Sequence, residues 1–354
     1  MKKLFALLLV ALMLTAFLAG CAQQEGAKEG GENGEAVEEE PKSTYPDRNI
    51  IAVVGFSPGG PTDVIARGVL PIVQEIFGVG IGINNMAGAA SAPAAEHVLA
   101  QKPDGYTIFF GSEIMSVWQV MGTTNLSPTK DFIPVKIVSE AIPVMAVPPD
   151  SPFNSVEELI AYAKEHPGEL RISTAGPGTV PHVSGLLLQQ YLGVEFTFVP
   201  YQGGKPAVIA VMSKEVDATI EMVQSMVAEH QGGQLKILSS FTNEPIPGLE
   251  EIPPVGKIYP ELSPHVPYGP YFGVFVSKDC PAEVVEAWEA ALDQAIEDQR
   301  WIDYTNQFYL VRVNYSGDAA LDYLEKWTSK AAWLLYDFGA AENSPEEFGI
   351  KRPE

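Results

Sequence analysis

The fold of this chain is decided by the stretch Ile50-Ile51-Ala52-Val53-Val54-Gly55-Phe56-Ser57-Pro58-Gly59-Gly60-Pro61-Thr62-Asp63. Its first five residues form a continuous apolar run, which is typical of a strand buried on both faces of a sheet. After the Gly-Gly pair, apolar residues recur at helical spacing from Val64 to Phe77. A glycine loop at such a junction lets backbone N–H groups face outward, and the helix N-terminus adds partial positive charge. The stretch therefore predicts an α/β unit with an anion site at the end of its strand.

A second loop of this type lies far downstream, at Tyr201-Gln202-Gly203-Gly204. It follows a strand-like run from Phe196 to Val199 and opens a helical run through Met212. Either loop alone is also compatible with a tight turn that binds nothing. A dinucleotide loop or a P-loop is excluded because neither Gly-x-Gly-x-x-Gly nor Gly-Lys-Ser/Thr is present here. Together the two loops predict two lobes that face each other across a cleft, with something negative between them.

Strand-like and helix-like runs alternate along most of the remaining chain, which predicts the α/β class with helices on both faces of parallel sheets. The proline-rich stretch from Asn243 to Pro270 is interpreted as the excursion before the chain returns to the first lobe. We therefore expect lobe I to comprise residues 45–130 and 271–340. Lobe II should comprise residues 131–270, and residues 341–354 should form a C-terminal tail.

The N-terminus has the order of an export signal over residues 1–20. Lys2 and Lys3 precede a short apolar run, and the sequence Leu18-Ala19-Gly20-Cys21 follows it. The run is too short for a comfortable membrane span. Its end resembles the bacterial lipoprotein signal, in which Cys21 carries lipid such as palmitate; the alternative is an ordinary signal peptide with a chance cysteine. Residues 21–44 are rich in glycine and glutamate, which predicts a disordered acidic tether.

Composition excludes some classes of partner and site. The net charge of −23 argues against nucleic acid, which requires a basic surface. Cys280 has no disulfide partner once Cys21 is lipidated, and it is either a thiol acidified by the helix start at Pro281 or a passive cysteine. The histidines are scattered and the cysteines do not cluster, so we expect no metal and no cofactor.

Further candidates stand at other strand ends. Ser112 ends an apolar run, and its hydroxyl is expected to point into the cleft. Thr179, in the loop Gly176-Pro177-Gly178-Thr179, either caps the next helix or donates to a ligand. His182 is either a packed structural residue or a hydrogen-bonding group at the cleft. Asp63 and Glu221 could form an acid/base pair, but Asp63 more simply buttresses the first glycine loop. Because the Gly-x-Ser-x-Gly elbow is missing, we expect no enzyme activity.

Several motifs in series resemble one family. They are Gly55 to Arg67, Asn85 to Ala90, Pro103-Asp104-Gly105-Tyr106-Thr107, Ser173 to His182, and Val199 to Gly204. In this order they are similar to the signature of the Bug receptors, the TctC-like substrate-binding proteins of tripartite tricarboxylate transporters. The resemblance covers roughly residues 46–336.

The resemblance implies a two-lobed periplasmic-binding-protein fold of type II and a receptor that binds a small organic carboxylate. One loop from each lobe would clamp a carboxylate, and the ligand-binding set here would be Phe56, Ser57, Gly59, Gly60, Thr62, Asp63, Ser112, Thr179, His182, Tyr201, Gln202, Gly203, Gly204 and Glu221. The closed receptor, a monomer, would dock on the permease subunits of a membrane transporter. Lipid and tether would hold it on the extracytoplasmic side of the cell membrane, on a Gram-positive surface or in a periplasm.

The sequence departs from the family pattern at two places. Ala89-Ala90-Ser91-Ala92-Pro93 stands where the family usually has more glycine, and Glu221-Met222 stands where it often has aspartate or a small polar residue. Glu221 would read an ammonium or hydroxyl group on the solute, or simply narrow the pocket. Phe56, Tyr201 and Tyr268 form either an aromatic wall or part of the core. A sensor for a signalling partner, and a hydrolase of acidic substrates, are the alternative functions.

Overall fold

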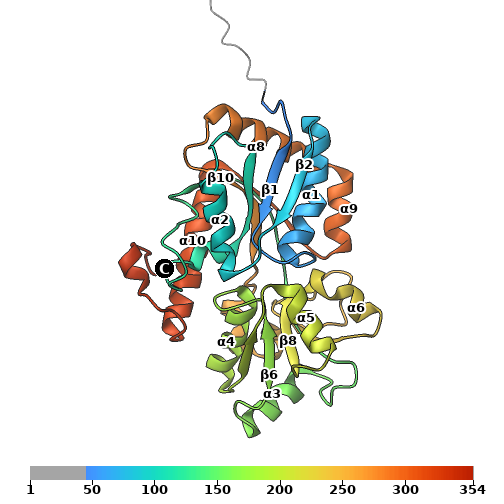
Figure 1. Cartoon of the computed structure of the whole chain (residues 1–354). Helices are drawn as coiled ribbons and strands as arrows, with labels where there is room; N and C mark the ends of the chain where they lie inside the picture. The colour runs from blue at the N-terminus through green and yellow to red at the C-terminus, as the bar shows by residue number, and fades with distance from the viewer. Residues whose placement is uncertain (1–44, 354) are drawn as a thin grey trace, which may run out of the picture. The chain divides into compact units, whose positions relative to one another are not determined.

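The computed structural model describes residues 45–353. The expected signal peptide and the whole of the expected tether, Cys21 included, lie outside these residues. Within them, two separate sheets have six and five strands, each accompanied by helices (Figure 1). No helix between residues 45 and 353 is long and apolar enough to cross a membrane.

The six-stranded sheet has the order β11-β4-β10-β3-β1-β2. Its strands β1, β2 and β3 are parallel, whereas β10 runs antiparallel to both β3 and β4. The bounds of the six strands are β1 Ile50–Val54, β2 Ile81–Asn85, β3 Thr107–Ser112, β4 Phe132–Glu140, β10 Tyr271–Ser277 and β11 Val311–Tyr315. Ile50, Ala52, Val53 and Val54 of β1 are fully buried, as the apolar run predicted, but Ile51 is 42% exposed.

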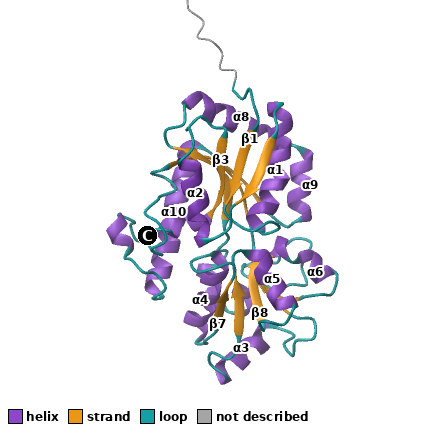
Figure 2. Ribbon diagram, in the orientation of Figure 1, coloured by secondary structure: helices purple, strands orange, loops and turns teal. Residues whose placement is uncertain are grey.

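Helices α1, α2, α8, α9 and α10 accompany this sheet (Figure 2). Their apolar faces and the sheet enclose one large core that contains the fully buried Trp118, Trp288 and Trp301. The bounds of the helical segments are α1 Pro61–Phe77, η1 Ala89–Ser91, α2 Ala92–Leu99, η2 Glu113–Val117, α8 Ala282–Glu297, α9 Gln299–Gln307, α10 Gly317–Asp337 and η5 Pro345–Phe348.

The five-stranded sheet has the order β7-β6-β8-β5-β9. Its strands are β5 Pro143–Val147, β6 Arg171–Thr174, β7 Thr197–Pro200, β8 Ala218–Met222 and β9 Lys236–Ser240. The helical segments here are α3 Val156–Glu165, α4 Val180–Leu192, α5 Gly204–Met212, η3 Val223–Ser225, α6 Val227–Gln231, α7 Val255–Ile258 and η4 Pro260–His265. Two apolar clusters form the core of this part.

The expected boundary between the lobes at residue 130 does not coincide with the sheets. Strand β4 lies between β10 and β11 in the six-stranded sheet, so the chain first reaches the other sheet after Glu140. Lys136 and Ser139 are polar residues within the otherwise apolar run of β4. Both are almost fully buried, and Lys136 is compensated by Asp293 and Asn314, whose side-chain oxygens accept from its Nζ at 2.7 Å.

Candidate functional site

Asp63, in the first turn of α1, supports the first glycine loop through hydrogen bonds. Its Oδ2 accepts from the Gly59 N–H at 2.8 Å, and its carboxylate also accepts from Arg67 Nε and Asn85 Nδ2. Burial raises the pKa of Asp63, but the hydrogen bonds from Arg67, Gly59 and Asn85 outweigh it and hold this pKa below its ordinary value. A carboxylate used in this way is a support for the loop and a poor general base.

The sequence predicted that the N–H groups of the first Gly-Gly pair face outward. In the structure both of them are instead bonded within the loop. Gly59 donates to Asp63, and Gly60 donates to the Ser57 carbonyl at 3.2 Å. For the N–H groups of Thr62, in the first turn of α1, and of Gly204 and Lys205, in the first turn of α5, the structure instead gives no acceptor among the described residues. The helix dipoles still make this a place for an anion.

The two glycine loops touch one another. Ser57 Oγ donates to the Gln202 carbonyl at 2.7 Å, and a β-carbon added to Gly60 would lie 3.8 Å from the Gly204 nitrogen. Gly203 has a φ of 117°, which an L side chain rarely adopts. At Gly204 an added β-carbon would lie 2.6 Å from Glu221 Oε2 and 2.9 Å from Pro61 Cδ. The glycines therefore permit close approach of the two lobes, and the structure is a closed one.

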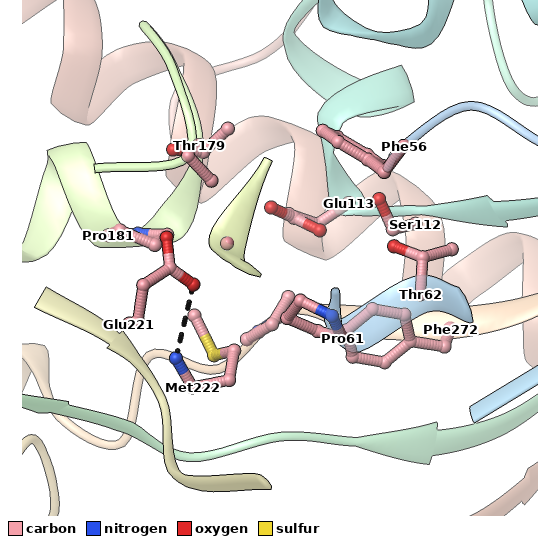
Figure 3. A pocket seen from close by; sticks show the side chains of 13 residues that line it. Phe56, Pro61, Thr62, Ser112, Glu113, Thr179, Pro181, Glu221, Met222 and Phe272 are labelled. Carbon is pink, nitrogen blue, oxygen red and sulfur yellow. Dashed lines mark hydrogen bonds between the residues drawn. The ribbon is translucent and has the colours of Figure 1, made fainter. Parts of the chain in front are cut away.

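A small cavity of about 30 Å³ lies beside the touching loops, and residues of both lobes line it (Figure 3). Its volume is enough for one or two water-sized groups. Lining residues are Phe56, Pro61, Thr62, Ser112, Glu113, Ala175, Thr179, Pro181, Gly204, Glu221, Met222, Pro270 and Phe272. We name this space the inner cavity.

A larger cavity of about 180 Å³ shares Phe56, Ala175 and Thr179 with the inner cavity. We name it the outer cavity. Residues 88–91 and 200–202 supply most of its other walls. Ala89, Ala90 and Ser91 all have positive φ values, between 41° and 65°, which is strained for residues with a side chain. The Ser91 hydroxyl is buried and has no hydrogen-bond partner among the described residues.

Two buried carboxyl groups from opposite lobes face the inner cavity. Glu113 follows β3 and Glu221 stands in β8, and Figure 3 shows both carboxylates directed into the same space. Glu113 Oε1 accepts across the interlobe contact from the Val180 N–H, at the start of α4, at 3.4 Å. Burial raises the pKa of Glu113 to about 7. Burial, together with the charge of Glu113, raises that of Glu221 to about 8.

Residues 65–326, most of the chain, match the family model described as "Tripartite tricarboxylate transporter family receptor". The chain belongs to this family. A relative from Pseudomonas sp. (strain P51), the UPF0065 protein in the tcbD-tcbE intergenic region, is 28% identical over 83% of this chain and 87% of its own length.

Solved structures agree with this assignment. The receptor is similar to the periplasmic binding protein BugD, with a TM-score of 0.78 and 24% identity over 84% of this chain and 99% of that one. It is also similar to MatC from Rhodopseudomonas palustris with bound malate, with a TM-score of 0.75 and 25% identity over 82% of this chain and 100% of that one. The predicted two-lobed fold is thus confirmed, and the chain is a solute-binding receptor and not an enzyme.

Other predicted site residues have mixed positions in the receptor. Thr179 lines both cavities, but its hydroxyl donates to the Gly176 carbonyl at 2.7 Å and does not cap α4. His182 Nδ1 accepts from the Gly178 N–H, and its ring lies edge-on to Phe198. Burial lowers the pKa of His182 to about 4, so the ring is neutral at neutral pH. The residue is not among those that line either interlobe cavity.

The aromatic candidates divide between cavity and core. Phe56 lines both cavities and Tyr201 lines the outer one. Tyr268 lines neither, because it is buried and stacks on Trp327 with ring centroids 5.4 Å apart. Cys280 is buried as well, and burial raises the pKa of its thiol to about 11, which contradicts an acidified thiol. Among the described residues no cluster of metal-ligating side chains occurs.

Sequence reasoning missed Glu113 and Ser91 as site residues. Glu113 stands one residue after a buried parallel strand, at the edge where ligands gather in open α/β sheets, and that position was an available signal. The role of Ser91 had no comparable signal. It depends on a backbone turn through three left-handed residues, which propensity does not predict for alanine and serine.

Proposed function

We propose that this receptor captures a small organic carboxylate between its lobes and delivers it to a tripartite tricarboxylate-type secondary transporter. The observation that carries the proposal is that Thr62, in the first turn of α1, and Gly204, in the first turn of α5, line one cavity, with no acceptor given for the N–H group of either. They come from opposite lobes, so an anion held by both favours the closed form. The family description and the malate bound by the similar MatC support the same class of solute.

Binding is tested by calorimetry and thermal shift with a panel of mono-, di- and tricarboxylates, each paired with its neutral amide. We expect at least one carboxylate to bind and its amide to bind at least tenfold more weakly. A ligand at a hundred times its dissociation constant should add about 2.7 kcal/mol to stability, which is a clear rise in melting temperature. Binding of neutral sugars or of the amides, with no response to any carboxylate, would overturn the proposal.

We further propose that the receptor acts on the extracytoplasmic side, attached to the membrane through lipid on Cys21. The short export signal and the glutamate-rich segment behind it support this. In the producing cell, Cys21→Ser should move the protein from the membrane fraction to the soluble fraction without changing solute binding. Delivery is tested with the two-subunit permease in vesicles, where uptake of the bound carboxylate should require added receptor. Uptake at the same rate without receptor would favour a sensing role instead.

A further inference from the structure

The inner cavity is unusually acidic for a site that holds an anion. Glu113 and Glu221 are 5% and 0% exposed, and they approach it from opposite lobes. No lysine, arginine or histidine lines the cavity, and neither carboxyl group takes part in an ion pair among the described residues. Two buried carboxylates without a cation are expensive, because burial penalises each charge and their mutual repulsion adds to this.

One oxygen of this pair lacks a partner. Glu221 Oε2 accepts from the Met222 N–H at 3.3 Å, whereas Oε1 is buried without a hydrogen bond of normal geometry among the described residues. The Ala175 N–H lies near enough to favour the charged form without completing such a bond. A buried carboxylate oxygen that faces a cavity and has no donor is a place for a donor from outside the chain.

The position of Glu113 limits how many carboxylates of the solute the cleft can hold. The Glu113 carboxylate lies on the N-terminus of α4, so it already occupies an anion position in the cleft. The remaining positions for an anion are the first turns of α1 and α5, where Thr62 and Gly204 line the same cavity. The chain's own carboxyl groups thus leave room for one carboxylate of the solute and require a positive group next to it.

We infer that the solute is a zwitterion, an α-amino acid or a close analogue, whose ammonium group is held between Glu113 and Glu221 while its carboxylate lies on the first turns of α1 and α5. An ammonium group brings one positive charge and three donors, which matches the unpartnered Glu221 Oε1 and the two uncompensated carboxyl groups. The inner cavity suits a charged head group, and the outer cavity, with Phe56, Tyr201 and the Ser91 hydroxyl, would take the side chain.

This inference rests on the proposed function, and its test separates the two. Calorimetry compares molecules with one carbon skeleton that differ at one position: alanine, lactate and propionate, and aspartate, malate and succinate. We expect the amine of at least one set to bind at least tenfold more tightly than its hydroxyl and unsubstituted counterparts. Equal or tighter binding of the counterparts would overturn the inference and leave carboxylate capture intact. Failure of every carboxylate, amines included, would overturn both.

Two variants locate the preference. Glu113→Gln and Glu221→Gln keep the shape of the side chains but remove charge, so each should reduce the amine preference by about tenfold or more. Glu140→Gln is a matched control, because Glu140 accepts from Tyr323 and lines neither interlobe cavity. An unchanged preference in both cavity variants, with their melting temperatures near that of the parent, would overturn the assignment.

Proton release gives a second readout that does not depend on folding defects. Binding of an ammonium group should ionise the glutamate pair and release protons, which calorimetry detects by repeating the titration in buffers of different ionisation enthalpy. The other titratable groups near the pair are Tyr268 and Tyr271, whose own pKa values are raised by burial and by the charge of Glu113. They stay protonated near neutral pH, so the released protons come from the glutamates. No proton release with an amine that binds would overturn the role of the pair.

Discussion

Gly204→Ala isolates the contact between the lobes from the fold of either lobe. The new methyl carbon would lie 2.6 Å from Glu221 Oε2 and 2.9 Å from Pro61 Cδ, where ordinary contact begins at 3.4 Å. Pro61 opens α1 and belongs to the opposite lobe, so the contact of the new methyl with Pro61 exists only when the lobes are closed, whereas Glu221 belongs to the same lobe as Gly204. In the closed form the Glu221 side chain faces the inner cavity from a buried strand, and we expect it to move away from the new methyl when the cleft opens.

The size of the effect follows from these distances. Relieving the two contacts requires movements of about 0.5 to 0.8 Å against packed groups, and overpacking of this kind costs about 1–3 kcal/mol. Because the cost falls mainly on the closed state, the dissociation constant for the solute should rise by about 5- to 150-fold. Gly204 is the first residue of α5 and its φ is not left-handed, so alanine there should leave the open lobe as stable as before.

Calorimetry with the best-binding carboxylate measures the effect, and a thermal melt without ligand checks the fold. Gly82→Ala is the matched control, since Gly82 lies in β2 and an added β-carbon would meet only ordinary contacts, the nearest at 3.4 Å. This control should bind as the parent does. The reasoning is refuted if Gly204→Ala binds within twofold of the parent, because the glycine would then not be needed for closure.

Three more perturbations test other parts of the structure. Asp63→Asn should weaken the first glycine loop by about 1–3 kcal/mol, since an amide presents donors to the donors of Gly59 and Arg67, and a melt should show the loss; an unchanged melting temperature contradicts the buttress. The pKa values of Glu113 and Glu221 are raised in the closed form, so their contribution to its stability is complete below the ordinary glutamate pKa and is lost as the pH rises to about 8. Without ligand, the radius of gyration from small-angle X-ray scattering should therefore increase between pH 5 and pH 8.5. The double glutamine variant should not show this increase. Lys136→Ala should cost about 2–5 kcal/mol by leaving a cavity, whereas Lys136→Met should cost less than half as much, because Asp293 is half exposed and can be hydrated; equal losses in the two melts argue that the ion pair, not packing, matters.

The local pattern was sufficient to predict the elements that begin the cleft. The apolar run at 50–54, the Gly-Gly pair and the helical spacing after it are all short-range signals, and the structure has β1, the loop and α1 where they were expected. The second loop was predicted for the same reason. Both junctions depend on backbone geometry that glycine makes available, so neighbouring residues alone specify them.

Longer-range pairing explains what the sequence did not predict. Strand β4 contains a charged residue whose partners, Asp293 and Asn314, lie more than 150 residues away in the sequence. Helix α9 follows α8 with only Asp298 between them, and the Asp298 side chain caps the new helix by accepting from the Arg300 N–H. The function of Glu113 depends on Val180 in the other lobe. No window of adjacent residues contains these contacts of β4 and Glu113.

Charge links the cleft to the whole chain. A net charge of −23 repels an anion at long range, and the loop N–H groups can offset this only within a Debye length of roughly 8–10 Å. A dicarboxylate would also have to enter a cavity that already contains Glu113 and Glu221. A zwitterion has no net charge, so the long-range field neither repels nor attracts it, and at short range each of its charged ends meets an opposite one. The acidity of the chain and the acidity of the inner cavity therefore favour the same solute, although they act at different distances.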